Sequence, residues 1–262
     1  MIGPVPWIGG KNRLATKIIA LLPPHTAYVE PFCGGAQVFF HKQPSEVEVL
    51  NDLDRDIINF LRVCQWHEQE LIRFMRYMVA SRTWFDLLAN IDPASLTDVQ
   101  RAGRFLYLQK NCFGGLVTKQ HFHYGVVQRP NFNPARLPEV IAQAHTRLQH
   151  VQLESLPYEQ ILQRYDRETT LFYLDPPYWG PKLYRFNFAD EDFHQLCRYL
   201  ERIKGKFILS LNDSPAVRGT FGGFHLKETE IAYTSTLKAK KRYPELIITN
   251  FEPVDTEERV SA

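Results

Sequence analysis

The first fifty residues alternate between helical and strand-like patterns of apolar residues. Apolar side chains recur at helical spacing over residues 12–22, where two prolines end the pattern. Apolar runs over 27–29 and 47–50 have the length of buried strands, and a glycine turn and a short helix over 38–41 lie between them. A strand, a turn, a helix and a second strand form a βαβ unit, which predicts a parallel sheet.

The rest of the chain divides into an insertion and a second run of sheet elements. Residues 55–90 have an amphipathic helical pattern, whereas 91–145 combine glycine, histidine and tyrosine and are interpreted as a hairpin-rich insertion. The sheet pattern then resumes, with strands expected over 151–153, 169–174, 207–211, 225–233 and 245–251 and helices over 158–165 and 190–203. We therefore expect an α/β core over 1–54 and 146–262, interrupted by an inserted domain over 55–145.

Composition excludes some classes of protein and leaves others open. No run approaches the roughly 20 apolar residues of a membrane span, and the N-terminus lacks a signal-peptide pattern, so a cytoplasmic protein is expected. The four cysteines contain no CxxC pair, which favours neither a zinc site nor a disulfide framework. The net charge of +2 neither requires nor excludes a polyanionic partner.

Asp175-Pro176-Pro177-Tyr178 follows an apolar strand-length run. Two prolines keep the chain extended as it leaves the strand, at the sheet edge where open α/β sheets bind ligands. The Asp175 carboxylate and the Pro176 carbonyl can accept both hydrogens of an exocyclic amine, which would aim the nitrogen lone pair at an electrophilic methyl group. Tyr178 can stack on a base, worth roughly 1–3 kcal/mol. A plain proline turn is the alternative, but this tetrapeptide is an uncommon way to build one.

A glycine turn at 32–35 follows the first predicted strand and precedes a helix. Gly34 lets the backbone approach a ligand closely, and the helix N-terminus favours an anionic group. Asp52 ends the next strand, where an acid can hydrogen-bond to ribose hydroxyls, while Asp54 is interpreted as a helix cap. Taken alone, the turn is equally compatible with a strand-to-helix connection that binds nothing.

Residues 7–11 (Trp-Ile-Gly-Gly-Lys) precede the first predicted helix. The two glycines permit close approach, Lys11 offers a cation to a carboxylate, and Trp7 offers an aromatic wall. Taken alone, the segment is more typical of a buried tryptophan beside a solvated lysine. Its combination with the glycine turn and Asp52 favours a ligand site.

In this order, the motifs resemble those of the Dam-type, D12 class of adenine-N6 DNA methyltransferases. The matching segments are 7–11, 30–36, Asp52, 105–108, 111–116, 175–178, 210–213 and 243–246. The resemblance covers most of the chain. It implies an α/β, class I S-adenosylmethionine-dependent methyltransferase (Rossmann-like) sheet with an inserted helical and hairpin target-recognition domain.

The resemblance also implies roles for individual residues. S-adenosylmethionine would lie over the glycine turn and meet Trp7, Lys11, Glu30, Phe32, Gly34, Asp52, Tyr158 and Asp175. An adenine flipped out of double-stranded DNA would bind Asp175, Pro176 and Tyr178, and its amine would attack the sulfonium methyl directly, without a metal. Asp rather than Ser before Pro-Pro-Tyr favours adenine over cytosine, and a Pro-Cys motif for methylation of the cytosine ring is absent from the sequence.

Two groups of residues are candidates for contact with DNA. Lys238, Lys240, Lys241 and Arg242 form the densest basic cluster and are expected to contact phosphates, although a solvated hairpin tip is the alternative. In the insertion, base contacts are expected from Asn111, Lys119, Gln120 and Arg129. His121 and His123 share one face of a strand, but too few other ligands lie nearby to favour zinc.

The sequence departs from relatives that read GATC, so no recognition sequence is predicted. Pro6 stands where those relatives usually carry lysine, and residues 117–119 are Val-Thr-Lys instead of Arg-Tyr-Asn. Two alternatives to a DNA enzyme stay open: the same chemistry on RNA or a protein glutamine, and a non-catalytic nucleic-acid-binding relative. Asp175 and Tyr178 count against the second alternative, and a monomer is expected.

Overall fold

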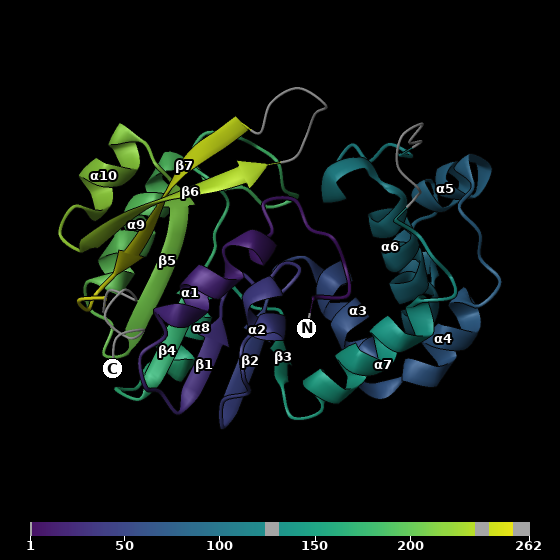
Figure 1. Ribbon diagram of the computed structural model, residues 1–262, viewed down its shortest axis with the longest axis horizontal. Coiled ribbons are helices and arrows are strands. Elements are labelled where there is room, and N and C mark those ends of the chain that lie inside the picture. The colour runs from purple at the N-terminus through teal and green to yellow at the C-terminus, as the bar shows by residue number, and fades with distance from the viewer. Residues whose placement is uncertain (1, 124–130, 234–240, 254–262) are drawn as a thin grey trace, which may run out of the picture.

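A computed structural model describes residues 2–123, 131–233 and 241–253 and contains a seven-stranded sheet with helices on both faces (Figure 1). The strands are β1 (Ala27–Glu30), β2 (Val47–Asn51), β3 (Gln152–Glu154), β4 (Thr170–Leu174), β5 (Lys206–Asn212), β6 (His225–Tyr233) and β7 (Lys241–Thr249). Their order across the sheet is β3-β2-β1-β4-β5-β7-β6. The first five strands of this order pair in parallel, and β7 pairs antiparallel with both β5 and β6. This is a Rossmann-like, class I arrangement, so the predicted fold is confirmed.

Alternate residues of the central strands enter two different hydrophobic clusters. In β4, Leu171 and Tyr173 join a cluster with α1 (Ala15–Ala20) and α2 (Gln37–His41). Phe172 and Leu174 join a second cluster on the opposite face. The helices covering that second face are α8 (Tyr158–Tyr165), α9 (Asp190–Leu200) and α10 (Pro215–Phe221). Because parallel strands are buried on both faces, they read as continuous apolar runs in the sequence.

The segment between β2 and β3 is a group of helices beyond the β3 edge of the sheet (Figure 1). They are α3 (Arg55–Trp66), α4 (Glu68–Met75), α5 (Arg82–Ala89), α6 (Asp98–Asn111) and α7 (Leu137–Leu148). The interpretation of 91–145 as hairpin-rich was wrong, because α6 and most of α7 lie there, and among the described residues only an isolated bridge joins Cys112 to Phe122. A capping box at Thr97 and Gln100 begins α6, and this motif was a usable helix signal.

Other boundaries differ by a few residues. The helix expected over 12–22 is a 3-10 turn, η1 (Lys11–Arg13), followed by the shorter α1. Helix α10 was not predicted, and β7 begins at Lys241, inside the segment expected to be a basic loop. The expected domain boundary at 146 falls within α7. None of the described helices has both the length and the apolarity that a membrane span requires.

The sheet brings together the carboxyl ends of β1, β2 and β4, which are neighbours in the order β2-β1-β4. The glycine turn follows β1, Asp52 follows β2, and Asp175 follows β4. Strand order reverses between β1 and β4, and ligands of open α/β sheets bind outside such a switch point. The three motifs singled out in the sequence therefore meet at one edge.

Candidate active site

The glycine turn packs against the N-terminal segment. Gly34 has φ of +44°, which lies in the left-handed region that favours glycine. A Cβ at Gly34 would lie 2.5 Å from the indole nitrogen of Trp7. The amide of Ile8 donates to the carbonyl of Gly115 at 3.0 Å. The turn, the segment around Trp7 and the insertion are thus held against one another.

Asp52 receives two backbone hydrogen bonds at the end of β2. The amide of Gly34 donates to Oδ2 at 2.9 Å, and the amide of Asp54 donates to Oδ1 at 2.8 Å. Burial nevertheless raises the pKa of Asp52 to about 6, because desolvation of the charged form outweighs these donors. Asp54 caps α3 by accepting from the amide of Asp56 at 2.9 Å, as expected from the sequence.

Asp175 is held through one carboxylate oxygen only. Its Oδ1 accepts from Lys11 Nζ at 2.5 Å and from the Ser210 hydroxyl at 3.0 Å. Its Oδ2 accepts no hydrogen bond from the described residues, and neither does the carbonyl of Pro176. Burial raises the pKa of Asp175, and Lys11 and Ser210 oppose that rise. Two acceptors that lie next to each other in the chain are therefore available at the end of β4.

The side chain of Lys11 contacts the catalytic motif predicted from the sequence, at Asp175. Its ammonium donates to Asp175 and to the carbonyl of Gly9 at 3.2 Å, and lies 3.3 Å from Glu245 Oε1. An ammonium has three N–H donors, so these acceptors match its full capacity. Lys11 also lines the pocket described below, but its charge is directed at Asp175. Contact with a cofactor carboxylate stays a prediction.

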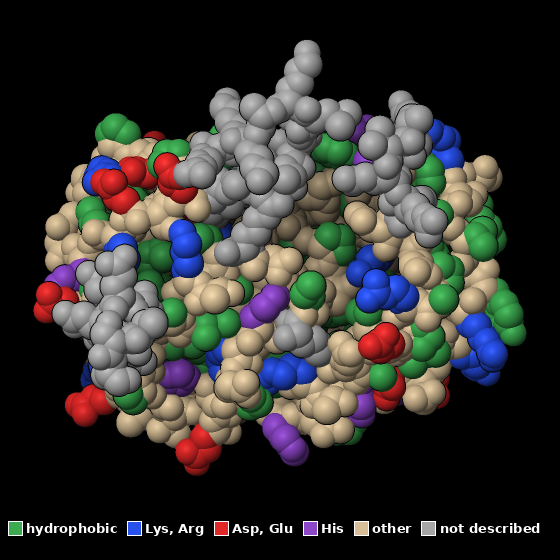
Figure 2. Space-filling model, viewed as in Figure 1, with side chains coloured by type: hydrophobic (Ala, Val, Ile, Leu, Met, Phe, Trp, Pro, Cys, Tyr) green, Lys and Arg blue, Asp and Glu red, His purple; other side chains and the backbone are tan. Residues whose placement is uncertain are grey.

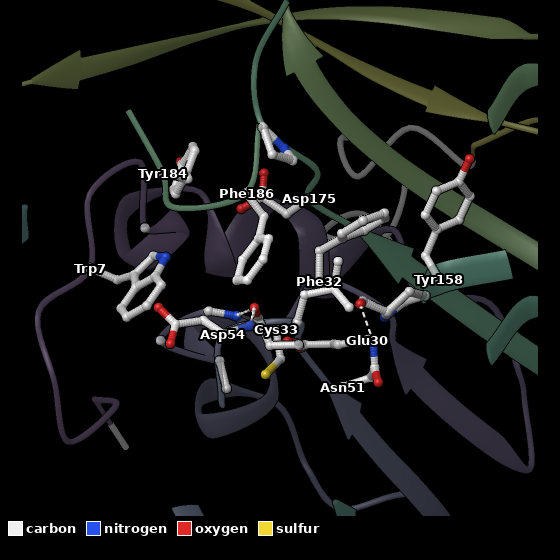
Figure 3. A pocket seen from close by; sticks show the side chains of 18 of the residues that line it. Trp7, Glu30, Phe32, Cys33, Asn51, Asp54, Tyr158, Asp175, Tyr184 and Phe186 are labelled. Carbon is white, nitrogen blue, oxygen red and sulfur yellow. Dashed lines mark hydrogen bonds between the residues drawn. The ribbon is translucent and has the colours of Figure 1, made fainter. Parts of the chain in front are cut away.

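The segment after Tyr178 returns across the site. The Tyr184 hydroxyl donates to the carbonyl of Ile8 at 3.2 Å. The Arg185 guanidinium reaches Asp54 at 3.1 Å and Asp56 at 2.6 Å, at the start of α3. Phe186 follows at the edge of the same pocket (Figure 3). The loop after the Asp-Pro-Pro-Tyr motif is thus fastened both to the N-terminal segment and to the insertion.

A pocket of about 860 Å³, including its open mouth, lies between these elements. Trp7, Phe32 and Phe186 surround it as aromatic walls (Figure 3). The ring of Phe32 lies 5.3 Å from that of Tyr158 and 5.6 Å from that of Phe188, centroid to centroid. Apolar walls with a few polar groups are typical of a small-molecule site. Glu30, Asp52 and Asp175 are acidic lining residues that belong to the predicted motifs.

A family model for the D12 class of N6 adenine-specific DNA methyltransferases matches residues 7–235. The chain belongs to this family. It is an adenine-specific DNA methyltransferase, and S-adenosylmethionine is its methyl donor. The resemblance inferred from the motifs is confirmed.

Curated relatives match over much of this methyltransferase. The Type II methyltransferase M1.LlaDCHI of Lactococcus lactis subsp. cremoris is 26% identical, and the match covers 94% of this chain and 94% of its own. The Type II methyltransferase M.CviBI of Paramecium bursaria Chlorella virus NC1A is 24% identical, covering 87% of this chain and 90% of its own. A DNA adenine methylase of Serratia marcescens is 31% identical over 114 residues, 42% of each chain.

The pocket fits the methyl donor in its chemistry. A nucleoside needs an apolar slot for its base and an acceptor for its ribose hydroxyls, and Phe32, Tyr158 and Asp52 offer these. When bound, S-adenosylmethionine supplies a methyl group on a sulfonium cation, for which aromatic faces are favourable neighbours. Trp7 and Phe186 provide such faces.

Glu30, which was expected to bind the cofactor, is almost completely buried in the methyltransferase. It is 1% exposed. Its Oε1 accepts from the Tyr28 hydroxyl at 2.7 Å and from the amide of Phe39 at 2.9 Å. Burial raises its pKa to about 8. These contacts join β1 to α2 beneath the pocket, and contact with the cofactor stays a prediction.

The candidate DNA-binding residues fall in different surroundings. Asn111 is buried and its side-chain amide donates to the carbonyl of Tyr107 at 2.9 Å. The Gln120 amide donates to Gln109 Oε1 at 2.5 Å and to the carbonyl of Leu116 at 2.7 Å, whereas Lys119 is exposed. Arg129, Lys238 and Lys240 lie outside the described residues, as do the side chains of Lys241 and Arg242.

His121 and His123 belong to no candidate metal site in the described part of the chain. No group of three or more His, Cys, Asp or Glu side chains there is arranged to hold a metal ion. The ring of His123 instead contacts that of Phe113, 5.4 Å between centroids.

Several residues of the site were missed in the sequence. Ser210 on Asp175, Arg185 on Asp54 and Asp56, and Glu245 on Tyr178 were given no role. Each contact joins residues that lie 35 or more positions apart in the chain. The available signal for Ser210 and Glu245 was that they lie in the matching segments 210–213 and 243–246, whereas Arg185 was only a lone arginine in a loop.

The pKa of Asp52 leads to a test of its role. If the donor's ribose hydroxyls favour the ionised carboxylate, binding weakens as pH falls through about 6, where Asp52 takes up a proton. The Kd of S-adenosylmethionine is expected to rise roughly tenfold from pH 7 to pH 5. Calorimetric titration across this range measures the change. Asp52→Asn should bind more weakly at pH 7 and lose most of the pH dependence, and a wild-type Kd independent of pH would contradict the role.

Proposed function

We propose that this methyltransferase acts on an adenine flipped out of double-stranded DNA, with Asp175, Pro176 and Tyr178 holding the base. The observation that carries the proposal is the hydrogen bonding of the Asp175 carboxylate, which engages only one of its two oxygens. Lys11 and Ser210 occupy its Oδ1, while Oδ2 and the Pro176 carbonyl accept nothing from the described residues. An exocyclic amine has two hydrogens to donate, and these two oxygens are suited to accept them.

Lys11 and Ser210 keep the carboxylate in position and ionised. Two donors on one oxygen fix the orientation of the carboxyl plane, which leaves the second oxygen at a defined place. The Lys11 cation offsets the cost of burying the Asp175 charge. As the amine binds, both acceptors draw its hydrogens into one plane and direct the nitrogen lone pair out of that plane. Positioning of two bound reactants can lower a barrier by roughly 7–11 kcal/mol.

Tyr178 is placed to meet the base. It is half-buried and adjoins the two acceptors in the chain. A flipped adenine offers a flat face on which an aromatic ring can stack, worth roughly 1–3 kcal/mol. Extrusion of a base from a duplex costs a few kcal/mol, so stacking and the two amine hydrogen bonds together can offset it.

The charge of the insertion supports DNA as the macromolecule that it contacts. Residues 55–145 contain 11 Lys and Arg against 7 Asp and Glu, although the whole chain has a net charge of only +2. Figure 2 shows Lys and Arg side chains on the surface of this helical part, at the right of the view. We propose residues 55–145 as the target-recognition domain, and Lys238, Lys240 and Lys241 as phosphate contacts. Neutralising those three lysines should lower the salt dependence of DNA binding.

The test is to identify the methylated product. The protein is incubated with labelled S-adenosylmethionine and, in parallel, with unmethylated double-stranded DNA, RNA or protein. N6-methyladenine in the digested DNA is the expected result, and sequencing then maps the methylated sites. Label in RNA or protein with none in DNA would favour the alternative substrates, and absence of label everywhere would favour a non-catalytic binding role.

The cellular setting follows from the substrate. We propose a cytoplasmic enzyme that acts as a monomer, because duplex DNA in a bacterial-type cell lies in the cytoplasm and all motif residues of the site come from one chain. Light scattering of the purified protein tests the monomer, and cell fractionation tests the location.

A further inference from the structure

Glu245 is a buried acid on β7 to which the proposed chemistry gives no role. It is 2% exposed. Its Oε1 accepts from the Tyr178 hydroxyl at 2.8 Å and lies 3.3 Å from Lys11 Nζ. A buried carboxylate is unfavourable unless it is paired and hydrogen-bonded. Both of these partners of Glu245 are residues of the active site.

The register of the sheet explains why Glu245 reaches the motif. Strand β7 lies antiparallel to β5, and Glu245 is directly opposite Asn212. Opposed residues of two strands have side chains on the same face of the sheet. Asn212 also contacts the motif segment, since its Oδ1 accepts from the amide of Trp179 at 3.0 Å. Ser210 lies two residues earlier on β5, on the same face, and donates to Asp175. Ser210, Glu245 and Asn212 thus lie on one face of the sheet. They hydrogen-bond to Asp175, Tyr178 and Trp179, respectively.

We propose that Glu245 is a positioning residue that orients Tyr178 and Lys11 for methyl transfer. The inference rests on the proposed roles of Asp175 and Tyr178. A half-buried tyrosine ring with its hydroxyl fixed at the far end has fewer orientations than a ring held only at Cβ. The incoming adenine then meets a ring that is already ordered. The entropy lost in ordering the ring therefore does not add to the activation free energy of methyl transfer.

Glu245 also competes with Asp175 for the positive charge of Lys11. The Lys11 ammonium lies 2.5 Å from Asp175, 3.3 Å from Glu245 and 4.8 Å from the centroid of the Tyr178 ring. Glu245 itself is not among the residues that line the S-adenosylmethionine pocket. Loss of its charge should therefore change the turnover step and leave the affinity for S-adenosylmethionine nearly unchanged.

The test compares Glu245→Gln with a matched Glu→Gln change on the neighbouring strand. Glu228 on β6 is exposed and pairs with Arg218, so Glu228→Gln is the control. We expect Glu245→Gln to lower kcat on DNA roughly tenfold or more, as for loss of a charged hydrogen bond. The Kd of S-adenosylmethionine should stay within about twofold of wild type, and Glu228→Gln should leave both values unchanged.

A double-mutant cycle with Tyr178→Phe identifies the path of the effect. This variant keeps the ring and removes the hydroxyl, so it breaks the hydrogen bond to Glu245 from the other side. If Glu245 acts through that hydroxyl, Glu245→Gln should have a much smaller effect on kcat in the Tyr178→Phe background. If Glu245→Gln does not fold, Tyr178→Phe alone supplies the test, and it should lower kcat to a similar extent.

The outcomes separate this inference from the proposed function. An active wild type with unchanged kcat in Glu245→Gln would overturn the inference alone. An equal loss in both backgrounds would overturn the orientation of Tyr178 by Glu245, because the whole effect would then pass through Lys11. A wild type that transfers no methyl group to DNA would overturn the proposed function, and this inference with it.

Discussion

Asp175→Ala is expected to lower methyl transfer to DNA by at least roughly a thousandfold while S-adenosylmethionine still binds. Removal of a preorganised group at the reacting atoms typically costs roughly 10²- to 10⁴-fold in rate. Here the change removes the acceptor for the amine and also the partner of Lys11 at 2.5 Å. Lys11 keeps Glu245 as an ionic partner, so the fold should survive. Single-turnover kinetics measure the rate, and calorimetry measures the Kd of the methyl donor.

Asp190→Ala is the matched control for Asp175→Ala. Asp190 is exposed in the first turn of α9, and its loss should cost only the few tenths of a kcal/mol typical of a charge near a helix N-terminus. We expect wild-type turnover in this variant. Turnover near the wild-type level in Asp175→Ala would refute the assignment of Asp175 as the group that binds the amine.

Gly34→Ala is expected to have the second largest effect, on cofactor binding. An alanine there would have to adopt φ near +44°, at a cost of about 1–2 kcal/mol. Its Cβ would also meet the Trp7 indole nitrogen at 2.5 Å. Either Trp7 moves or the turn moves, and movement of the turn breaks the hydrogen bond from Gly34 to Asp52. The Kd of S-adenosylmethionine should rise roughly ten- to a hundredfold, since about 1.4 kcal/mol is a factor of ten.

Gly219→Ala controls for the loss of a glycine. Gly219 lies within α10, and an added Cβ there meets no atom within 4 Å. Alanine is a better helix former than glycine by up to about 1 kcal/mol. Denaturant unfolding should show Gly219→Ala to be slightly more stable than wild type, with the Kd unchanged. A Gly34→Ala protein with normal affinity would show that the turn does not shape the cofactor site.

The sheet could be predicted from the sequence because its strands have short apolar runs that end in turn signals. Helix α6 could not be recognised from its apolar periodicity, because nine of its fourteen residues are buried, including Arg104 and Gln109. An amphipathic pattern needs an exposed face, and α6 has little of one. Helix α6 is enclosed by α3, α4 and α5. Its apolar periodicity therefore could not reveal it, whatever the helix propensity of its residues.

The candidate site was predictable at the level of motifs and unpredictable at the level of contacts. Proline, glycine and acid patterns placed Asp175, Gly34 and Asp52 at strand ends before the strand order was known. The partners of Asp175 depend on which strands become neighbours and in which register. Lys11 was expected to serve the cofactor, and only the order β4-β5-β7 brings its ammonium between Asp175 and Glu245. Spacing in the sequence carries no information on that pairing.

The separation of Lys11 and Asp175 along the chain has a consequence for biosynthesis. Their hydrogen bond spans 164 residues, and Glu245 lies a further 70 residues beyond Asp175. Contacts between such distant residues form slowly, because loop closure must precede them, and chains emerge from the ribosome N-terminus first. Nascent protein exposes its basic helical segment well before β7 is synthesised. With the roles proposed for residues 55–145 and for Glu245, a growing polypeptide would be able to associate with nucleic acid before its site for methyl transfer is complete, because β7 is synthesised last of the strands.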